Sequence, residues 1–491
     1  MNMAIQYLDD DVVDLRRANG KTWQYYWGDA CEVIAEDAQG KHVRIHGLKG
    51  VVDEGLISAS AKLRPAGLLR MSMVDVQQGD GLIIDTPEGK VIFIDGGDNV
   101  LFARHAAARY RGTTADDPLI VDAVVVTHGD ADHFEGLTEL AKSESHDTRR
   151  KRVFVAPRRV YHNGLAKRPG KLAGKKRRDE DMFGATAEHD HQLYCLDLTD
   201  DPSALANDEL NEPFQRWKKT IQSWRERLQQ VQNETLEVRR LDHTATDAFD
   251  FLHEEGITVD LLGPIVEQVG GVAGLPFLVE PPDDAELMLG VKPPKKSKAW
   301  SASHTINGHS IAFRLSYGNV RFLFTGDMNE EAMNRLHSAL PGASLAAEVL
   351  KAPHHGSADF NLAFLEEVKP VVSLISSGDE SEAKEYIHPR ATLMAALGKA
   401  SRTTPAVIFC TELAAFFKAR TYVQDPQVPN RRFFAFERTN FGIAHVRTDG
   451  KRVLAFTHSG KKGANEAYRF DVKADGTVRF AAKVVKRSAP G

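Results

Sequence analysis

Two histidines and two aspartates stand within six residues of one another, in the segment His128-Gly-Asp130-Ala-Asp132-His133. The segment follows an apolar run that ends at Thr127 and precedes a helical pattern, so we expect a loop between a buried strand and a helix. Such loops are where α/β folds place their chemistry. Imidazole nitrogens and carboxylate oxygens suit divalent ions such as zinc or manganese. The segment therefore predicts a metal site in an α/β fold, the simpler alternative being that these side chains only cap the helix.

Further side chains of the ligand type follow other apolar runs of the predicted core. Asp327 closes FLFTGD, His354 and His355 follow VLKAP, and His388 follows the loop after VVSLISSGD. His309 precedes the strand that ends at Asp327. Because the chain of 491 residues has only 19 histidines, a random scatter would not place so many of them at strand ends. This placement favours a metal site over helix capping.

The order of these motifs resembles the metallo-β-lactamase superfamily, whose pattern is HxHxDH. HGDADH is preceded by IDGG and followed by FTGD and HHGS. More narrowly, VDVQQGDGLIIDTPEGKVIFIDGG, VVVTHGDADHFEGL, VRFLFTGD and LKAPHHGS resemble the soluble hydrolase domain of the ComEC family of DNA-internalisation competence proteins. The similarity covers about residues 68–150 and 300–400. It implies an α/β fold, the metallo-β-lactamase αββα sandwich, and phosphodiester hydrolysis with two divalent ions, zinc or manganese.

The resemblance also implies roles for individual residues. His128, Asp130, Asp132 and His133 would bind the metals, with Asp130 in place of the superfamily's second histidine, and Asp327 would bridge or bind the second ion. Two ions held close together make a bridging water acidic enough to act as the nucleophile. Asp132 would both ligate a metal and orient that hydroxide.

The remaining candidates carry open alternatives. Asp95, at the end of IFID, would orient the loop from behind or would simply cap a turn. His388 is expected to be a ligand, although IHPR has isoleucine where the family has glycine. One of His354 and His355 would bind metal and the other would protonate the leaving group, in an order that the sequence leaves open. His309 is either a ligand or part of a surface loop.

The length of the chain predicts several units. Residues 1–66 contain short β-type runs and predict an SH3-like β barrel, and residues 67–425 predict the hydrolase domain, with an insertion at about 157–300. Within this insertion a helix is expected from Glu212 to about Asn233, with Trp217 and Trp224 in the core. Residues 426–491 alternate β runs with Asp-Gly turns and predict a small C-terminal β element.

Charge and composition limit the partners. The net charge of −5 argues against coating nucleic acid through overall charge, although basic loops at Lys167–Arg178 and Lys295–Lys298 could contact a phosphate backbone. Solvated charged loops are the simpler reading of both. A secretory signal and a membrane-spanning stretch are not apparent, and three scattered cysteines fit a reducing compartment, so we expect a cytoplasmic protein without a membrane partner.

Three functions remain open at this stage. The first is a metal-dependent phosphodiesterase or nuclease that acts on DNA or another nucleic acid. The second is a hydrolase of a small lactone, lactam or thioester, which would use the same metals with a different pocket. The third is a noncatalytic binding protein that keeps the fold and recruits a protein partner through its terminal β modules.

Overall fold

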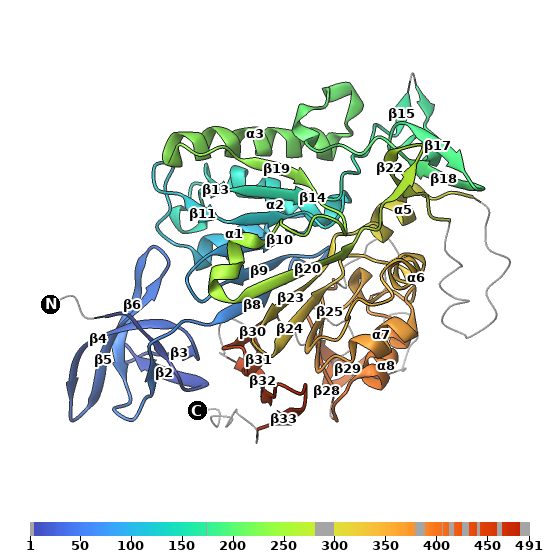
Figure 1. The fold of residues 1–491 in the computed structure, drawn as a ribbon. Helices are drawn as coiled ribbons and strands as arrows, with labels where there is room; N and C mark the ends of the chain where they lie inside the picture. Colours follow the sequence, from blue (N-terminus) through green and yellow to red (C-terminus); the bar gives the residue numbers. More distant parts are fainter. Residues whose placement is uncertain are drawn as a thin grey trace.

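The computed structural model describes residues 4–172, 174–279, 299–378, 388–404, 406–411, 417–424, 432–438, 442–458 and 464–481. The described chain is mixed α/β, and two large sheets dominate it (Figure 1). Among the described residues, none of the helices combines the length and the apolar character that crossing a membrane requires. The predicted basic loop at Lys295–Lys298 lies outside the described residues.

The first sheet has ten strands, and the four strands at one edge, β10, β12, β14 and β19, pair in parallel. Within this sheet, Leu82–Asp85 pairs antiparallel with Val91–Ile94 as a hairpin. Both of these strands are buried along their whole length, which explains their unbroken apolar character. The strands in order are β19 (Glu237–Arg240), β14 (Arg159–His162), β12 (Ala123–Val125), β10 (Val91–Ile94), β9 (Leu82–Asp85), β8 (Leu69–Met73), β30 (Ile443–Thr448), β31 (Arg452–His458), β32 (Ala464–Val472) and β33 (Val478–Phe480).

The second sheet has six strands, and β24 to β27 are parallel. Its order is β20 (Ile257–Gly263), β23 (Ala312–Tyr317), β24 (Val320–Phe324), β25 (Val349–Lys351), β26 (Val372–Ile375) and β27 (Val407–Cys410). Strands β23 and β24 pair antiparallel on either side of the turn at Gly318.

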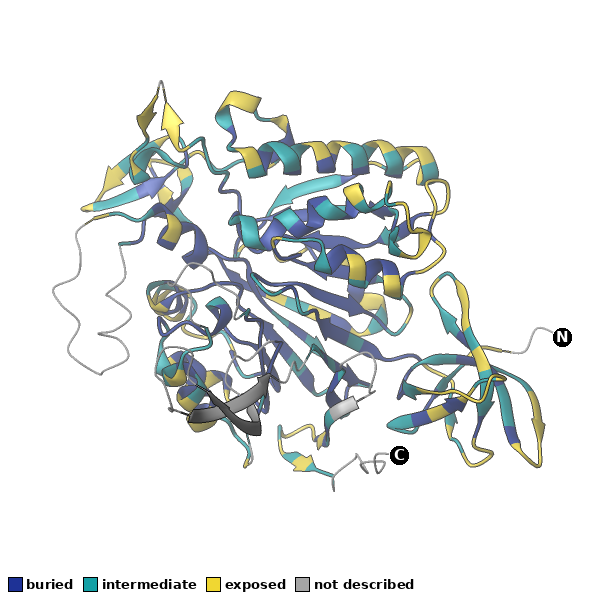
Figure 2. Cartoon of the chain, turned by 180° about the vertical axis from the view of Figure 1, so that it is seen from behind, coloured by how far each residue is buried: buried dark blue, intermediate teal, exposed yellow. Residues whose placement is uncertain are grey.

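The two sheets pack face to face through one apolar core, to which residues such as Ile94 and Val125 of the first sheet and Phe313 and Phe324 of the second contribute. Helices α1, α2 and α3 cover the outer face of the first sheet, and α6, α7 and α8 cover that of the second. The layers therefore run helix, sheet, sheet, helix, and the dark interior in Figure 2 follows the two sheets. The helices are α1 (Leu101–Arg109), α2 (Ala131–Ser143), α3 (Glu212–Gln232), α5 (Ala302–Gly308), α6 (Glu330–Ala339), α7 (Leu362–Val368) and α8 (Ala391–Ala400).

Helix α3 matches the predicted helix closely. Asn211 caps its start by accepting a hydrogen bond from the backbone N–H of Phe214, and Asn233 ends it in the left-handed region. Trp217 and Trp224 are fully buried against the first sheet's outer layer, as predicted. A single apolar stripe on a long helix thus fixes the face that it presents to the core.

The N-terminal residues form a separate antiparallel sheet with its own small core, which includes Leu15, Cys31 and Val43. The edges of this sheet are β3 and β7, so it is a curled half-barrel and not the closed barrel predicted for residues 1–66. With only two residues, β7 is too short to close the barrel. The strands in order are β3 (Thr22–Tyr26), β2 (Val12–Arg16), β6 (Gly50–Ile57), β5 (Gly40–Gly47), β4 (Ala30–Asp37), β1 (Gln6–Leu8) and β7 (Leu63–Arg64).

The C-terminal strands differ from the predicted separate β element. Strand β30 pairs with β8, with Ala444 opposite Met73, so β30 to β33 extend the first sheet. Their apolar side chains, including Val446 and Val453, enter the core between the sheets. The physical reason is that β8 would otherwise be an open edge beside a buried apolar face.

The predicted insertion at about 157–300 is also largely part of the core, because β14 and β19 belong to the first sheet and β20 to the second. Outside the two large sheets lie a four-stranded sheet and three strand pairs. These are β17 (Thr186–His189), β18 (Gln192–Cys195), β22 (Val272–Pro276) and β21 (Glu267–Val269), then β11 (Leu119–Val121) with β13 (Val155–Pro157), β15 (Lys171–Leu172) with β16 (Lys175–Lys176), and β28 (Phe417–Gln424) with β29 (Arg432–Arg438).

Candidate metal centre

The segment from His128 to His133 comprises the end of the loop between β12 and α2 and the first turn of α2, at the strand-to-helix connection that the sequence predicts. Both histidines are completely buried. Asp130 occupies the N-cap position of α2 but makes no capping hydrogen bond, and its carboxylate instead pairs with Lys167. Capping therefore does not explain Asp130.

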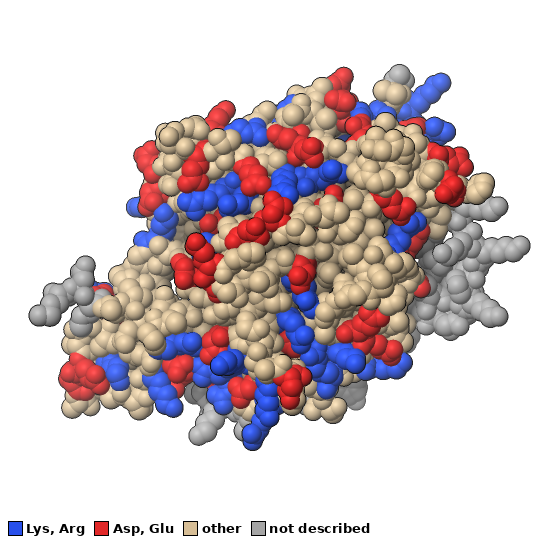
Figure 3. Space-filling model, viewed as in Figure 1, with Lys and Arg blue, Asp and Glu red and all other residues tan. Residues whose placement is uncertain are grey.

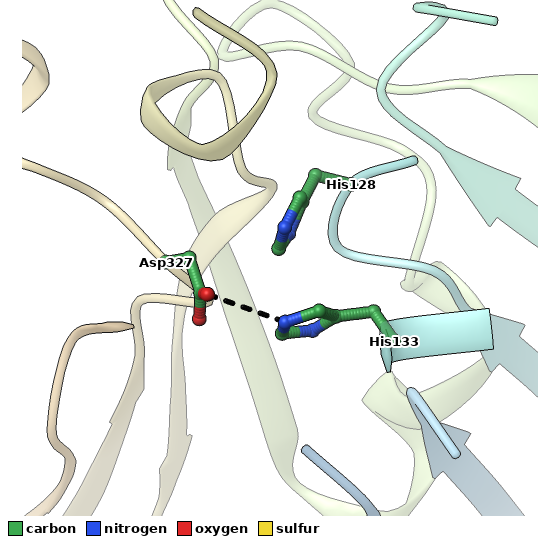
Figure 4. Close-up of side chains that lie close together, drawn as sticks. All are labelled: His128, His133 and Asp327. Carbon is green, nitrogen blue, oxygen red and sulfur yellow. Dashed lines mark ion pairs between the residues drawn. The ribbon is translucent and has the colours of Figure 1, made fainter. Parts of the chain in front are cut away.

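Asp327 is the point on which three histidines converge. Its Oδ2 atom lies 3.3 Å from Nε2 of His133, 3.0 Å from Nε2 of His355 and 3.8 Å from Nε2 of His354. The ring of His128 lies 4.0 Å from that of His133, and Figure 4 shows these two histidines side by side, opposite Asp327. These three residues can bring one ligand atom each to within 4.8 Å of the others. The cluster joins the loop of the first sheet to the end of β24 in the second.

The donor atoms of this cluster fit a cation. The atoms His133 Nε2, His355 Nε2 and Asp327 Oδ1 are buried. None of the three makes a hydrogen bond of acceptable geometry with the described residues. Burial alone would lower the pKa of His355, but Asp327 and Asp80 outweigh it and raise that pKa to about 10. The carboxylates that hold a proton on His355 can hold a divalent ion in its place, since metal binding displaces protons from its ligands.

Asp95 stands behind His133. Its carboxylate lies 2.8 Å from Nδ1 of His133, and it accepts hydrogen bonds from the backbone N–H and the hydroxyl of Thr127 at 2.8 and 2.6 Å. An acceptor at Nδ1 fixes the proton there and leaves Nε2 free to face the cluster. This contact is the one expected of a residue that orients a ligand from behind.

The backbone around the cluster is unusual. Gln77, Asp95, His354 and His355 all have positive φ, of 65°, 56°, 43° and 50°. A non-glycine residue in this region costs about 1–3 kcal/mol and persists only where its surroundings fix it. Strain of this kind gathers at functional sites, which agrees with the convergence of histidines here.

The two adjacent histidines have different surroundings. His355 is buried and can join Asp132 with His133, or Asp80 with Asp327, in groups that could hold an ion. The side chain of His354 is 20% exposed, and its Nε2 lies 3.4 Å from the Asn307 amide. The ring of His388 lies 5.8 Å from that of His354. His355 is therefore the inner histidine, while His354 and His388 lie further out.

Two predicted ligands point elsewhere. His309 is buried, and its Nε2 donates a hydrogen bond to the carbonyl of Pro276 at 2.7 Å, so it is neither in the cluster nor in a surface loop. It follows the end of α5, which turns its ring toward β22. Asp130 is engaged by Lys167 and does not join the groups of described residues that could hold an ion.

Two residues of the site are absent from the sequence-based predictions. Asp80 and Lys351 are 1% and 2% exposed, and they form an ion pair beside Asp327. The sequence does contain an indication of both residues. Asp80 stands between two glycines and Lys351 stands inside an apolar run, and charged residues in such segments need partners if they are buried.

Comparisons with known proteins bear on this site. Residues 74–169 match the sequence profile of the metallo-beta-lactamase superfamily. The matched residues include Asp80, Asp95 and the segment from His128 to His133, whereas Asp327 lies beyond them.

Among solved structures, the long form of RNase Z from yeast is similar at 10% sequence identity and a TM-score of 0.24. The similarity covers 63% of this chain and only 36% of that one. A search of curated proteins finds no match.

Proposed function

We propose that this protein is a hydrolase that uses two divalent metal ions, zinc or manganese, to cleave phosphodiester bonds in nucleic acid. One observation carries the proposal: His133 and His355, from loops of opposite sheets, direct Nε2 at the same oxygen of Asp327 in a buried cluster. The resemblance to the ComEC hydrolase domain favours a phosphodiester over a lactone, lactam or thioester.

In this proposal the inner residues hold the ions, namely His128, Asp132, His133, Asp327 and His355. When bound, divalent ions acidify water and offset the negative charge that develops on a phosphate during hydrolysis. Asp132, whose side chain is 24% exposed, stands at the open side of the cluster and orients the attacking water.

His354 then serves as the general acid. It lies at the rim, its Nε2 is near the cluster, and its partial exposure leaves it accessible to substrate. A proton on Nε2 of His354 would pass to the leaving oxygen of the substrate.

A basic segment leads from the cluster to the surface and supports a polyanionic substrate. Lys167 pairs with Asp130 at the cluster, and the chain then runs into the hairpin of β15 and β16, where Lys171, Lys175 and Lys176 are exposed. Among the described residues, these three lysines form no ion pair. Blue side chains project at the upper right of Figure 3, where Figure 1 places β15. Exposed cations that form no ion pair with the described residues, in a segment that continues from Lys167, are suited to a phosphate backbone.

The terminal parts of the chain have a different role in this proposal. The half-barrel formed by residues 6–64 has its own core and is proposed to be an SH3-like module that recruits a protein partner. We propose that this module ends at residue 66 and that the hydrolase domain begins at residue 67 and includes β30 to β33 as strands of its first sheet.

The function is tested by incubating the purified chain with single- and double-stranded DNA after loading with manganese or with zinc. The same assay is made on a variant with Asp132→Ala and His133→Ala, and bound metal is quantified in both proteins. We expect the variant to lose metal and cleavage together.

Other results would favour other functions. Bound metal without DNA cleavage would contradict the nuclease and favour a small-molecule hydrolase, which lactone, lactam and thioester substrates would then test. Absence of metal from the unmodified protein would favour a noncatalytic binding protein.

The basic hairpin should control the salt dependence of DNA binding. Changing Lys171, Lys175 and Lys176 to alanine should make the dependence of the DNA association constant on salt less steep. The negative slope of log K against log salt should become smaller in magnitude by about 2–3, since each phosphate contact contributes roughly 0.9 on duplex DNA. Fluorescence anisotropy with labelled DNA at a series of salt concentrations measures this slope.

A matched control removes three exposed lysines from elsewhere, Lys21, Lys399 and Lys473. The overall charge then changes equally while the hairpin stays intact. Equal slopes for the two triple variants would contradict a specific role of the hairpin.

A further inference from the structure

His355 has a carboxylate behind it, as His133 does. Nδ1 of His355 lies 3.2 Å from the carbonyl oxygen of Ser376 and 3.4 Å from Oδ1 of Asp80. Because both neighbours are acceptors, Nδ1 carries a proton, and Nε2 is the ring nitrogen left to face the cluster at Asp327. Asp80 therefore contacts Nδ1 of His355 in the same way that Asp95 contacts Nδ1 of His133.

The other oxygen of Asp80 pairs with Lys351, a buried lysine at the end of β25. The same ammonium group donates a hydrogen bond to the carbonyl of Gly326 at 2.8 Å and lies 3.6 Å from Oδ1 of Asp327. Lys351 therefore contacts a loop of the first sheet through Asp80, and the turn that carries Asp327 in the second sheet. A buried pair needed only for charge balance would have no reason to contact both loops.

The residues just before Asp80 hold Asp132. Gln78 donates a hydrogen bond from its amide to Oδ2 of Asp132 at 2.9 Å. Gly79 has a φ of +88°, and a Cβ atom there would lie only 1.6 Å from the carbonyl oxygen of Asp132, so no larger residue fits. The hydroxyl of Ser376 donates to the carbonyl of Gly79 at 2.7 Å, which ties this loop to the second sheet as well.

From these contacts we infer that the loop Gln78-Gly79-Asp80, together with Lys351, is a positioning frame for the metal centre. Asp80 sets the orientation of His355, Gln78 sets that of Asp132, and Lys351 holds Asp80 and the Asp327 turn in register across the two sheets. None of the frame residues needs to touch substrate. The inference rests on the metal centre of the proposed function, but not on the identity of its substrate.

The frame is tested with Asp80→Asn, Lys351→Met and the double variant that carries both changes. The measurements are the dissociation constant for manganese, from competition with a chromophoric chelator, and the thermal midpoint of the metal-free protein. We expect Asp80→Asn to weaken manganese binding about 10- to 100-fold, the usual effect of losing a partner behind a ligand. Lys351→Met should lower the thermal midpoint most, because it leaves a buried carboxylate without its cation.

The double variant separates orientation from charge balance. It removes both charges together, so we expect it to regain thermal stability relative to Lys351→Met while still binding manganese weakly. A double variant that binds manganese as tightly as the unmodified protein would overturn the frame.

Asp85→Asn is the matched control. Asp85 is a fully buried carboxylate at the far end of β9, where it pairs with Arg109 and accepts a hydrogen bond from Tyr110. Its loss should reduce stability and leave manganese affinity unchanged, and an equal loss of affinity in this control would overturn the frame. Tight manganese binding without phosphodiester cleavage would instead contradict the proposed function, and the frame would stand if Asp80→Asn still weakened that binding.

Discussion

Asp327→Asn should remove bound metal and lower kcat/KM for DNA cleavage by at least about 1000-fold, or about 4 kcal/mol of transition-state stabilisation. The change keeps the shape of the side chain and removes its charge. The effect should be large because one oxygen of Asp327 faces Nε2 of both His133 and His355, so the change removes the negative charge on which these two rings converge. Initial cleavage rates and metal content, measured on the same preparation, give both quantities.

Asp122→Asn is a suitable control for this change. Asp122 is also a buried carboxylate, and it accepts a hydrogen bond from the backbone N–H of Val91 and pairs with Arg158, away from the cluster. Its replacement should alter stability alone. Unchanged cleavage by Asp327→Asn would contradict the assignment of the cluster as the active site.

The sequence predicts the parts of the site that depend on local order along the chain. Apolar runs that end in polar residues correctly locate the strand ends before His128 and before Asp327. They do so because a buried strand is a run of consecutive apolar residues, which the sequence shows directly. The same logic places Asp95 directly after β10, where it contacts His133.

The parts that were missed depend on pairing between distant segments. Asp80 comes from a loop of the first sheet and Lys351 from the end of β25 in the second, and the two lie 271 positions apart in the sequence. The hydrophobic periodicity of either segment does not predict a contact between them. The C-terminal strands were predicted to form a separate element. The alternation of apolar and polar residues along them indicates that one face is buried, but it does not identify the strand with which they pair, which is β8.

His309 shows a different limit of sequence reasoning. Its distance from Asp327 along the chain matched a ligand pattern, yet the local turn after α5 decides where the ring points. The hydrogen bond to Pro276 holds the ring against β22, and His309 does not join the groups of described residues that could hold an ion. Spacing in sequence therefore identifies a candidate ligand, and backbone geometry determines whether it reaches the site.

Trp217→Ala should lower the free energy of unfolding by about 3–5 kcal/mol, the usual cost of emptying a large aromatic site in a core. Trp217 is 1% exposed on α3, and its ring lies 5.4 Å from Trp224 and 6.0 Å from Phe134 of α2, the helix that begins within the His128–His133 loop. Urea titration followed by far-ultraviolet circular dichroism measures the loss. Trp23→Ala, at a 43% exposed position on the N-terminal sheet, should cost about 1 kcal/mol or less and is the matched control. If the two variants lost equal stability, α3 would not be a core helix, and its packing on α2 could not be what supports the loop that carries His128 and His133.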